Sequence, residues 1–529
     1  MIELMLQIIA TVVCTALFVW ATKKWLGAIQ QGGYKNGAFW GWFSQKENMF
    51  FNRLCVLAYS IALSVCVAVL CFSFLGTRIA QLISAIPFLV FTLTFLYSDR
   101  KYALKVPVHY TGRAVRLYTV YAVLTATFFF GAIRLLGFLS GINGSALYAV
   151  IAYVPFAVAI LCLPLIFTLA NAITSPFENA RNAKFVKRAG QVLGQTQIIR
   201  VGVVGSYGKT SVKNIVKTLL EEKYSVVCTP ASYNTPMGIA KTVFSTEFAE
   251  KQVFIAEMGA RKKGDIKELC ALVKPDFAVF TGVCRQHLQT FGNEQNVLAE
   301  KSEIIKSGAR TVCAESLKGR VDEVENVRFV NGAWVENVDL QATQTKFTLT
   351  LGENKVDVCV PLLGDSAVEN VVLGVTLALE MGLTLEEIKN GLAKLQPVAH
   401  RLQLIENGGV YILDDAYNAN EKGARTAIQA LGRFNGRKCM VTPGIVECGI
   451  LQTQLNETLG EEIAKANLDK VIIVGETLVG AVKNGYLKAG GVKENLTAVK
   501  TLKLAQEQLK DWLTVGDAVL FLNDLPDVY

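Results

Sequence analysis

Seven consecutive residues have the types and spacing of a phosphate-binding loop. They are Gly205, Ser206, Tyr207, Gly208, Lys209, Thr210 and Ser211. The glycines let backbone N–H groups approach phosphate oxygens, Lys209 can reach the outer phosphates, and Thr210 or Ser211 can place a hydroxyl on Mg²⁺. The general GxxxxGK[ST] pattern would have a glycine at Val203, which this sequence lacks. A β-branched apolar run precedes the loop and a helical pattern follows it, so the sequence predicts nucleotide binding.

The elements that must position this loop alternate between strand and helix. Apolar runs predict strands at 198–204, 225–228, 253–257 and 277–281, with helices at 210–222, 264–272 and 296–307 between or after them. Strands at 410–413, 438–441, 470–474 and 518–522 predict a second unit of the same kind. The fold class is therefore α/β, with a mostly parallel sheet that binds nucleotide at the carboxyl ends of its strands.

Three further residues stand where ligands bind in such folds. Glu257 ends a predicted strand, and a carboxylate there suits a Mg²⁺ shared with nucleotide phosphates. His287 follows the next strand, although a lone histidine is more often an ordinary surface or core residue. Lys301 lies on a helix among acidic residues, where a solvated ion pair is the simpler interpretation.

A chain of motifs resembles the Mur ligases. GSYGKTS, Glu257-Met258-Gly259-Ala260, His287-Leu288 and Lys301-Ser302-Glu303-Ile304 stand in the family's order and spacing, and Asp414–Asn420 resembles the DDxYNANP element of the MurF branch. The match covers roughly residues 198–450. It implies a P-loop central domain and a Rossmann-like C-terminal domain that closes over the site. That branch is the ATP-dependent ligase that adds D-alanyl-D-alanine to UDP-N-acetylmuramoyl-tripeptide.

The resemblance implies a role for each matching residue. Lys209, His287, Lys301 and Arg401 would be catalytic, and Thr210, Glu257, His287 and Lys301, the last as a carbamate, would hold two Mg²⁺ ions. ATP would contact the loop, Asn370 near adenine, Arg401 at the domain hinge and Asp415 on the ribose side, while Asn418 and Asn420 would meet substrate. A carboxylate would then be activated as an acyl phosphate and joined to an amine, with charge neutralised by Lys209 and the cations.

Three departures leave the two substrates open. The UDP-binding domain is not recognisable, the GxHNxxN element reads Gly364–Asn370 with Ser366 and Ala367 at its His-Asn pair, and residues 442–449 replace a GDMLELG-like stretch. The proline of DDxYNANP is Glu421. We expect a muramyl-peptide-like or lipid-linked carboxylate and an amino acid or dipeptide amine, in peptidoglycan precursor synthesis. The alternatives are a ligase for another cell-envelope or poly-amino-acid product and, more distantly, a transporter or receptor with a regulatory ATPase.

The first third of the sequence predicts a membrane region. Hydrophobic residues make up 52% of the 529 residues, and runs at about 5–21, 55–75, 79–97, 119–139 and 146–170 are each long enough to span a bilayer as helix. The loops at 22–54 and 98–118 and the segment after 170 are rich in Lys and Arg, which places them in the cytoplasm. We therefore expect a multi-pass plasma-membrane protein with cytoplasmic catalytic domains.

The predicted organisation is a membrane region at 1–180, a connector at 181–197, a central ATP-binding domain at 198–401 and a C-terminal domain at 402–529. The formal charge of +9 comes largely from Lys and Arg beside the apolar runs, so it does not indicate nucleic acid. The twelve cysteines show no CxxC pair or metal-ligand spacing, and we expect the cytoplasmic thiols to be reduced.

Overall fold

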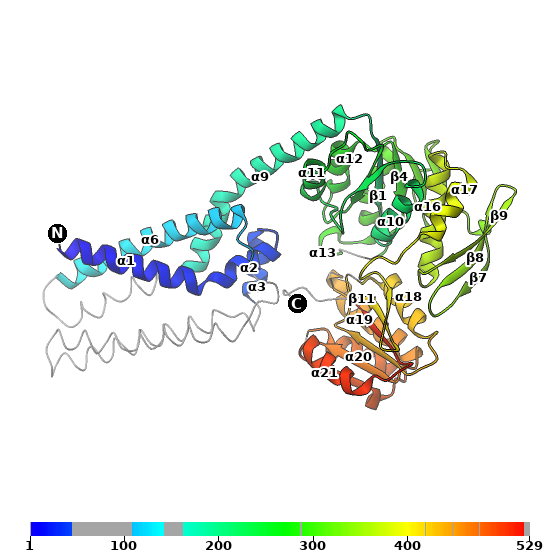
Figure 1. The fold of residues 1–529 in the computed structure, drawn as a ribbon. Coiled ribbons are helices and arrows are strands. Elements are labelled where there is room, and N and C mark those ends of the chain that lie inside the picture. Colours follow the sequence, from blue (N-terminus) through cyan, green and yellow to red (C-terminus); the bar gives the residue numbers. More distant parts are fainter. Residues whose placement is uncertain are drawn as a thin grey trace. The chain divides into compact units, whose positions relative to one another are not determined.

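The computed structural model describes residues 2–44, 108–141 and 162–522, apart from gaps at 286–287, 418, 447 and 476. The chain divides into two compact units, Met1–Asn182 with Pro526–Tyr529, and Ala183–Leu525 (Figure 1). The helix α9 (Leu163–Gln195) contributes residues to both units.

The first unit is helical. Its other described helices are α1 (Ile2–Ala21), α2 (Lys23–Gln31), α3 (Asn36–Phe43) and α6 (Gly112–Gly141). They pack around buried aromatic rings, and the Trp25 ring lies 6.0 Å from Phe39 and 5.7 Å from Phe167. Tilted and edge-on ring pairs at such distances stabilise a core beyond the area they bury.

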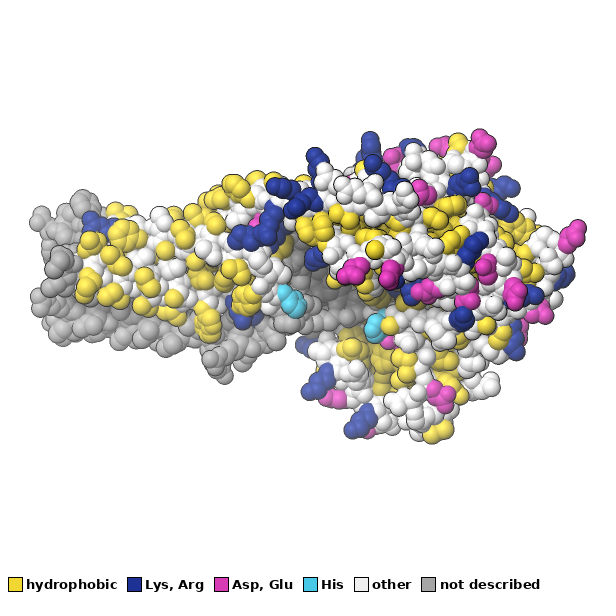
Figure 2. All heavy atoms as spheres, turned by 45° about the horizontal axis from the view of Figure 1, so that its top comes forward, with side chains coloured by type: hydrophobic (Ala, Val, Ile, Leu, Met, Phe, Trp, Pro, Cys, Tyr) yellow, Lys and Arg dark blue, Asp and Glu magenta, His cyan; other side chains and the backbone are white. Residues whose placement is uncertain are grey.

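Only one helix among the described residues is long and apolar enough to cross a bilayer by itself, over Gly112–Leu135 of α6. The pair Gln7–Ala21 and Lys23–Gln31 passes the same test together but is bent by 43°. The predicted spans at 55–75 and 79–97 lie outside the described residues, as does the span at 146–170 up to residue 161. Hydrophobic side chains nevertheless cover much of the visible surface of this unit (Figure 2).

The second unit begins with a parallel six-stranded sheet of order β2-β3-β1-β4-β5-β6. The strands are β1 (Ile199–Val204), β2 (Val226–Cys228), β3 (Val253–Met258), β4 (Phe277–Phe280), β5 (Arg310–Cys313) and β6 (Val327–Phe329). Every residue of β3 is buried, which is typical of a parallel strand covered on both faces. The predicted strands and the mostly parallel sheet are confirmed, to within two residues at each end.

Helices flank this sheet. They are α10 (Lys209–Leu220), α11 (Pro236–Ser245), α12 (Asp265–Val273), α13 (Leu288–Phe291), α14 (Glu294–Lys301) and α15 (Glu303–Lys306). The prediction of a single helix at 296–307 was wrong. The structure has two helices there, because α14 ends at Lys301 and α15 begins after Ser302. The break leaves Lys301 in the last turn of α14, which faces the phosphate-binding loop.

An antiparallel sheet that the sequence did not predict follows. It consists of β7 (Val335–Leu340), β8 (Thr345–Leu351) and β9 (Asn354–Val360). The chain then returns to the first sheet through α16 (Asp365–Glu380), which packs against α10, and α17 (Leu385–Ala393), which starts with a Thr384–Glu387 capping box.

The last part of the unit is a second six-stranded sheet of order β10-β11-β15-β12-β13-β14, with only the edge strand β10 antiparallel. Its strands are β10 (Gln403–Asn407), β11 (Val410–Asp415), β12 (Lys438–Thr442), β13 (Lys470–Val474), β14 (Leu496–Val499) and β15 (Ala518–Leu522). The main helices are α18 (Glu421–Leu431), α19 (Gln452–Lys465), α20 (Val479–Lys488) and α21 (Leu502–Trp512). The predicted second α/β unit is confirmed.

Candidate functional site

The phosphate-binding loop joins β1 to α10, and both of its glycines are required by their surroundings. Gly205 has φ +155°, and a Cβ there would lie 1.9 Å from Thr281 Oγ1. Gly208 has φ +71°, and its Cβ would lie 2.7 Å from Asn370 Oδ1. The loop is thus held against β4 and α16 at distances that exclude any side chain at these positions.

Two lysines meet at this loop. Lys209 Nζ and Lys301 Nζ each donate to the Gly205 carbonyl at 2.9 Å. Burial lowers the pKa of both, and the nearby Lys209 charge helps bring the pKa of the Lys301 amine to about 7. Two cations that share one neutral acceptor form a site with an electrostatic preference for anions.

The loop also carries a buried hydroxyl that could bond a phosphate oxygen of a nucleotide. Ser206 Oγ is buried and lies beside the Cys284 thiol. Within the described part of the chain it has no other hydrogen-bond partner. A buried hydroxyl left in this state has the capacity to bond a ligand oxygen. Ser206 lies at the start of the loop, so the site has both charge and hydrogen-bonding capacity for phosphate.

Glu257 lies beside the loop because β3 pairs with β1 in register, with Glu257 opposite Val203. Its side chain is buried at 1% exposure. Oε2 accepts from Thr210 Oγ1 at 3.0 Å and from Lys213 Nζ at 3.3 Å, and Oε1 accepts from Asn234 Nδ2 at 3.1 Å. The paired carboxylate and hydroxyl are oxygen ligands of the type that Mg²⁺ prefers.

The described residues contain no group of three His, Cys, Asp or Glu side chains that could hold a metal ion. Mg²⁺ usually takes one or two carboxylates and completes its octahedron with substrate phosphates and water. The predicted ligand His287 lies outside the described residues. Of the other predicted ligands, Thr210 and Glu257 are in direct contact, and Lys301 lies at the same loop, where it donates to the Gly205 carbonyl.

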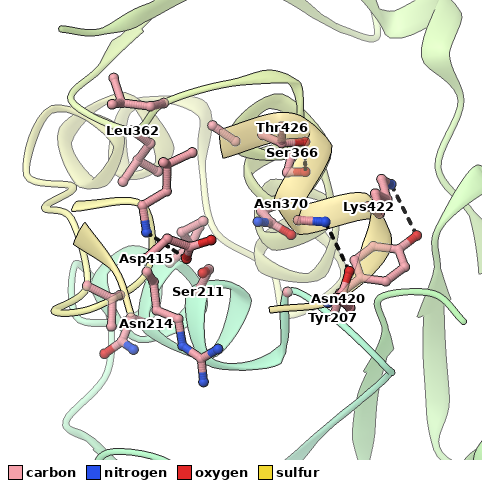
Figure 3. A pocket seen from close by; sticks show the side chains of 18 of the residues that line it. Tyr207, Ser211, Asn214, Leu362, Ser366, Asn370, Asp415, Asn420, Lys422 and Thr426 are labelled. Carbon is pink, nitrogen blue, oxygen red and sulfur yellow. Dashed lines mark hydrogen bonds between the residues drawn. The ribbon is translucent and has the colours of Figure 1, made fainter. Parts of the chain in front are cut away.

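A pocket extends from the loop to the second sheet (Figure 3). Its apolar wall comes from Ile215 on α10, Leu362 before α16 and Leu395 after α17. Its polar lining includes the predicted ATP contacts Asn370, Arg401 and Asp415 and the predicted substrate contact Asn420. An apolar slot with a few convergent polar groups is the usual form of a small-molecule site.

Arg401 links the two sheets of the second unit. Its Nη2 donates to Thr210 Oγ1 at 3.3 Å, and its guanidinium lies 4.1 Å from the centre of the Tyr417 ring. The neighbours His400 and Leu402 have φ +60° and φ +48°, so the backbone on both sides of Arg401 is in a conformation that non-glycine residues rarely adopt. Such strained backbone often occurs at functional sites.

Asp415 lies across the pocket from the loop. Its Oδ1 accepts from the Leu402 backbone N–H at 3.0 Å. Burial raises the pKa of this carboxyl to about 7, although the Arg401 charge acts in the opposite direction. Asn420 serves as N-cap of α18, because its Oδ1 accepts from the Gly423 N–H at 3.0 Å.

Lys422 connects α18 to the loop. It donates to Glu369 Oε2 at 2.5 Å and to the Tyr207 hydroxyl at 3.2 Å. Gly282 makes room for the Tyr207 ring, since a Cβ on Gly282 would lie 2.2 Å from the Tyr207 hydroxyl. Ser366, at the place of the missing His-Asn pair, lies 3.2 Å from Thr426 Oγ1 of α18.

The sequence placed most of these groups but missed three. Lys213, Asn234 and Lys422 were not predicted to take part, and Asn418 lies outside the described residues. One signal could have found Lys213, because it is a lysine on the apolar face of α10, among Val212, Ile215, Val216 and Leu219. Asn234 and Lys422 are brought to the site by contacts between distant segments, for which the sequence gives no local signal.

Two family models match the second unit. Residues 203–378 match the Mur ligase middle domain, and residues 400–522 match the Mur ligase glutamate ligase domain. The chain is 30% identical over 356 residues to the UDP-N-acetylmuramoyl-tripeptide–D-alanyl-D-alanine ligase of Escherichia coli, a match that covers 63% of this chain and 77% of that protein.

Solved structures of MurF ligases are similar in fold to this chain. The MurF ligase of Thermotoga maritima in complex with ADP superposes with a TM-score of 0.58 and 27% identity, over 66% of this chain and 81% of that one. MurF of Acinetobacter baumannii has the same fold, with a TM-score of 0.59 and 24% identity over 65% of this chain and 77% of that one.

Proposed function

Because the chain belongs to the Mur ligase family and is an ATP-dependent acid–amino-acid ligase, we propose that it joins a muramyl-peptide carboxylate to the amine of D-alanyl-D-alanine or a similar small amine. One observation carries the proposal. Lys209, Lys301 and Glu257 gather at the loop through hydrogen bonds to the Gly205 carbonyl and Thr210, and Ser206, Tyr207 and Gly208 of the same loop line a pocket that also contains Asp415. The peptidoglycan substrates are those in the names of the MurF relatives.

The loop residues would hold the phosphates. Ser206 offers a buried hydroxyl beside the Cys284 thiol, and Lys209 offers an ammonium that donates to the Gly205 carbonyl at 2.9 Å. Bound ATP supplies the phosphoryl group that turns the substrate carboxylate into an acyl phosphate, which the amine then attacks with loss of phosphate. Lys209 donates to the Gly205 carbonyl and Arg401 donates to Thr210 Oγ1, and both would stabilise the charge that develops during the two steps.

Thr210 and Glu257 would hold Mg²⁺, as their 3.0 Å contact places both oxygens on one side of the loop. The metal ion supplies charge neutralisation and orientation of the phosphates. The chain's own contribution is to keep Glu257 buried and aimed at this point. We propose His287 as a further Mg²⁺ ligand, and the support for it is the sequence motif alone.

Lys301 has the properties that carbamylation requires. Its pKa of about 7 means that much of the amine is uncharged near neutral pH, and only the uncharged amine reacts with carbon dioxide. A carbamate would replace an ammonium by anionic oxygens beside the metal site. Replacing Lys301 by Ala should abolish turnover, and short carboxylates should restore part of it. Full activity in the Ala variant would contradict this role.

The first unit is proposed as a plasma-membrane anchor with the catalytic domains in the cytoplasm. The support is the apolar stretch of α6 and the exposed large hydrophobic side chains on α1 and α6. They include Leu4, Met5, Ile8, Ile9, Val12, Val13, Val115, Val123 and Phe128. A lipid-linked carboxylate substrate would be consistent with an anchor at this place. A C-terminal reporter that appears outside the cell would contradict the topology.

Phosphate release by the purified full chain tests the substrate proposal. The acceptors to compare are UDP-muramyl tripeptide with D-alanyl-D-alanine and the lipid-linked form of the same peptide, against other carboxylate and amine pairs. Turnover with either muramyl acceptor is the expected result. Turnover only with unrelated pairs would favour a ligase for another cell-envelope or poly-amino-acid product, and the changed segments at 364–370 and 442–449 are where that specificity would lie.

A further inference from the structure

Lys213 is a buried charge that the proposed chemistry does not use. It lies on α10 one turn after Lys209, and its side chain is 1% exposed. Lysine is almost never buried to this extent unless its charge is paired. A structural explanation alone would be that it fills space in the core, but an apolar side chain would fill the same space without burying a charge.

All three donors of the Lys213 ammonium have acceptors. They are the Thr229 carbonyl at 2.9 Å, Glu257 Oε2 at 3.3 Å and the Ala231 carbonyl. An ammonium group has three donors, so its hydrogen-bonding capacity is filled. Two of the acceptors belong to the loop after β2, and the third is the carboxylate proposed as a Mg²⁺ ligand.

The loop that Lys213 holds is strained and returns to the same carboxylate. Ala231 has φ +43°, a left-handed conformation that is costly for a residue with a Cβ. Farther along, Asn234 Nδ2 donates to Glu257 Oε1 at 3.1 Å, and the Asn234 carbonyl accepts from the Gly259 N–H at 2.8 Å. Lys213 therefore fixes Glu257 directly through Oε2 and indirectly through the segment that holds Oε1.

We propose that Lys213 is a positioning residue for the metal-binding end of the site. It keeps the Glu257 carboxylate aimed at Thr210, and it braces residues 229–234 so that Asn234 restrains the opposite oxygen. It touches neither substrate nor metal, and it acts only through Glu257 and this loop. The inference rests on the proposed function only in taking Glu257 as a Mg²⁺ ligand.

Calorimetric binding of ADP to the full chain, with saturating Mg²⁺ and with EDTA, tests the role without requiring turnover. The Lys213→Met substitution keeps a long unbranched side chain and removes its charge. We expect ADP affinity in Mg²⁺ to fall roughly 10–100-fold, the usual cost of removing a group that orients a metal ligand. Affinity in EDTA should change by less than about twofold, because the loop that contacts the phosphates is untouched.

Lys217→Met is the matched control. Lys217 lies one turn farther along α10, in a half-exposed pair with Glu221 at 3.1 Å, and its loss should change neither affinity. If Lys213→Met does not fold, Lys213→Gln answers the same question, because its amide still donates two hydrogen bonds. A folded Lys213 variant whose Mg²⁺-dependent affinity equals that of the parent would overturn the proposal, as would an equal loss in Mg²⁺ and in EDTA. Absence of ligase turnover would count against the proposed substrates and leave this result unaffected.

Discussion

The two ends of the pocket are built in different ways. At the phosphate end, Lys209 at the start of α10, Lys301 at the end of α14 and Glu257 on β3 each form a direct hydrogen bond with the phosphate-binding loop. At the other end, which we propose holds the nucleoside and call the nucleoside end, the pocket is lined from α10, α16 and the segments around β11 and α18, including Asp415. The phosphate end therefore brings together two lysine amines and the carboxylate of Glu257, whereas the other end buries the carboxyl of Asp415.

Burial shifts the pKa values of the titratable groups at the two ends in opposite directions. It lowers the pKa of Lys301 to about 7 and raises the pKa of Asp415 to about 7. Each group moves toward its uncharged form because a charged form is poorly solvated in the interior. The variants below should separate the two ends by activity, by the pH dependence of stability and by nucleotide affinity.

Replacing Lys209 by Met should have the largest effect. Its ammonium is the cation on the loop itself, and loss of one such group typically lowers turnover roughly 10²–10³-fold. Phosphate release with saturating substrates measures the loss. The melting temperature should not fall, since burial already disfavours this charge. Activity within tenfold of the parent would show that the phosphate end does not depend on this charge.

Replacing Lys301 by Met should change how stability depends on pH. The folded pKa of Lys301 is about 7 and its ordinary value is 10.5, so between these values the unfolded chain binds the extra proton. The free energy of unfolding therefore rises with pH in that window, by at most about 1.4 kcal/mol per pH unit from this group. Below pH 7 both states are protonated, and the full penalty of the buried charge is present.

Thermal unfolding without nucleotide or metal, from pH 7 to 9.5, measures this slope. The Met variant should be more stable than the parent at pH 7, and the difference should shrink as pH rises. Parallel curves for the two proteins would contradict the lowered pKa of Lys301.

Replacing Asp415 by Asn should change the slope in the opposite sense. The folded pKa is about 7 and the ordinary value is 3.8, so in that window the folded chain binds the extra proton. Stability from this group therefore falls as pH rises from about 4 to 7. Thermal unfolding should show that the stability of the Asn variant relative to the parent increases as pH rises across the same range. We expect a smaller effect than at Lys301, because Arg401 partly compensates the Asp415 charge. An advantage of the Asn variant that is constant from pH 4.5 to 7 would point to altered packing in place of titration.

Replacing Lys422 by Met should have the smallest effect. Its side chain is 36% exposed and pairs with Glu369, and such pairs contribute about 0.2–1 kcal/mol. Calorimetry should show ADP affinity reduced by less than about fivefold. Lys394→Met, in the more exposed pair with Glu222, is the control and should leave affinity unchanged. A loss of ADP affinity of tenfold or more would show that Lys422 contributes more than a half-exposed ion pair does.

The sequence predicted the phosphate end better than the nucleoside end, and the reason is physical. The loop and Glu257 are each recognisable from a few adjacent residues next to a strand or helix boundary. Lys301 was assigned only through the resemblance to the Mur ligases, and the solvated ion pair that its local pattern favoured was wrong, because its side chain is buried against the Gly205 carbonyl. The apolar wall of the pocket combines Ile215, Leu362 and Leu395, which are ordinary core residues until the fold brings them together. The three-stranded sheet of β7, β8 and β9 was missed because it adds no motif to the strand-helix alternation.

Contacts between distant segments also explain the groups that were missed at the phosphate end. Glu257 was predicted from the strand end where it lies, whereas Asn234 contacts it from a loop 23 residues earlier. The helix break at Ser302 has no glycine or proline to mark it. Local pattern thus indicated which residues carry charge into the site, and only the fold shows which neighbours hold them there.

The Gly205 carbonyl, which accepts from both Lys209 and Lys301, has a consequence for selectivity among anions. An incoming phosphate must share the two ammonium groups with a carbonyl that already accepts one hydrogen bond from each. A single small anion therefore uses only the remaining N–H donors, whereas a nucleotide adds contacts along the rest of the pocket. We therefore expect weak competition by inorganic phosphate, so that this product leaves the loop readily after each turnover.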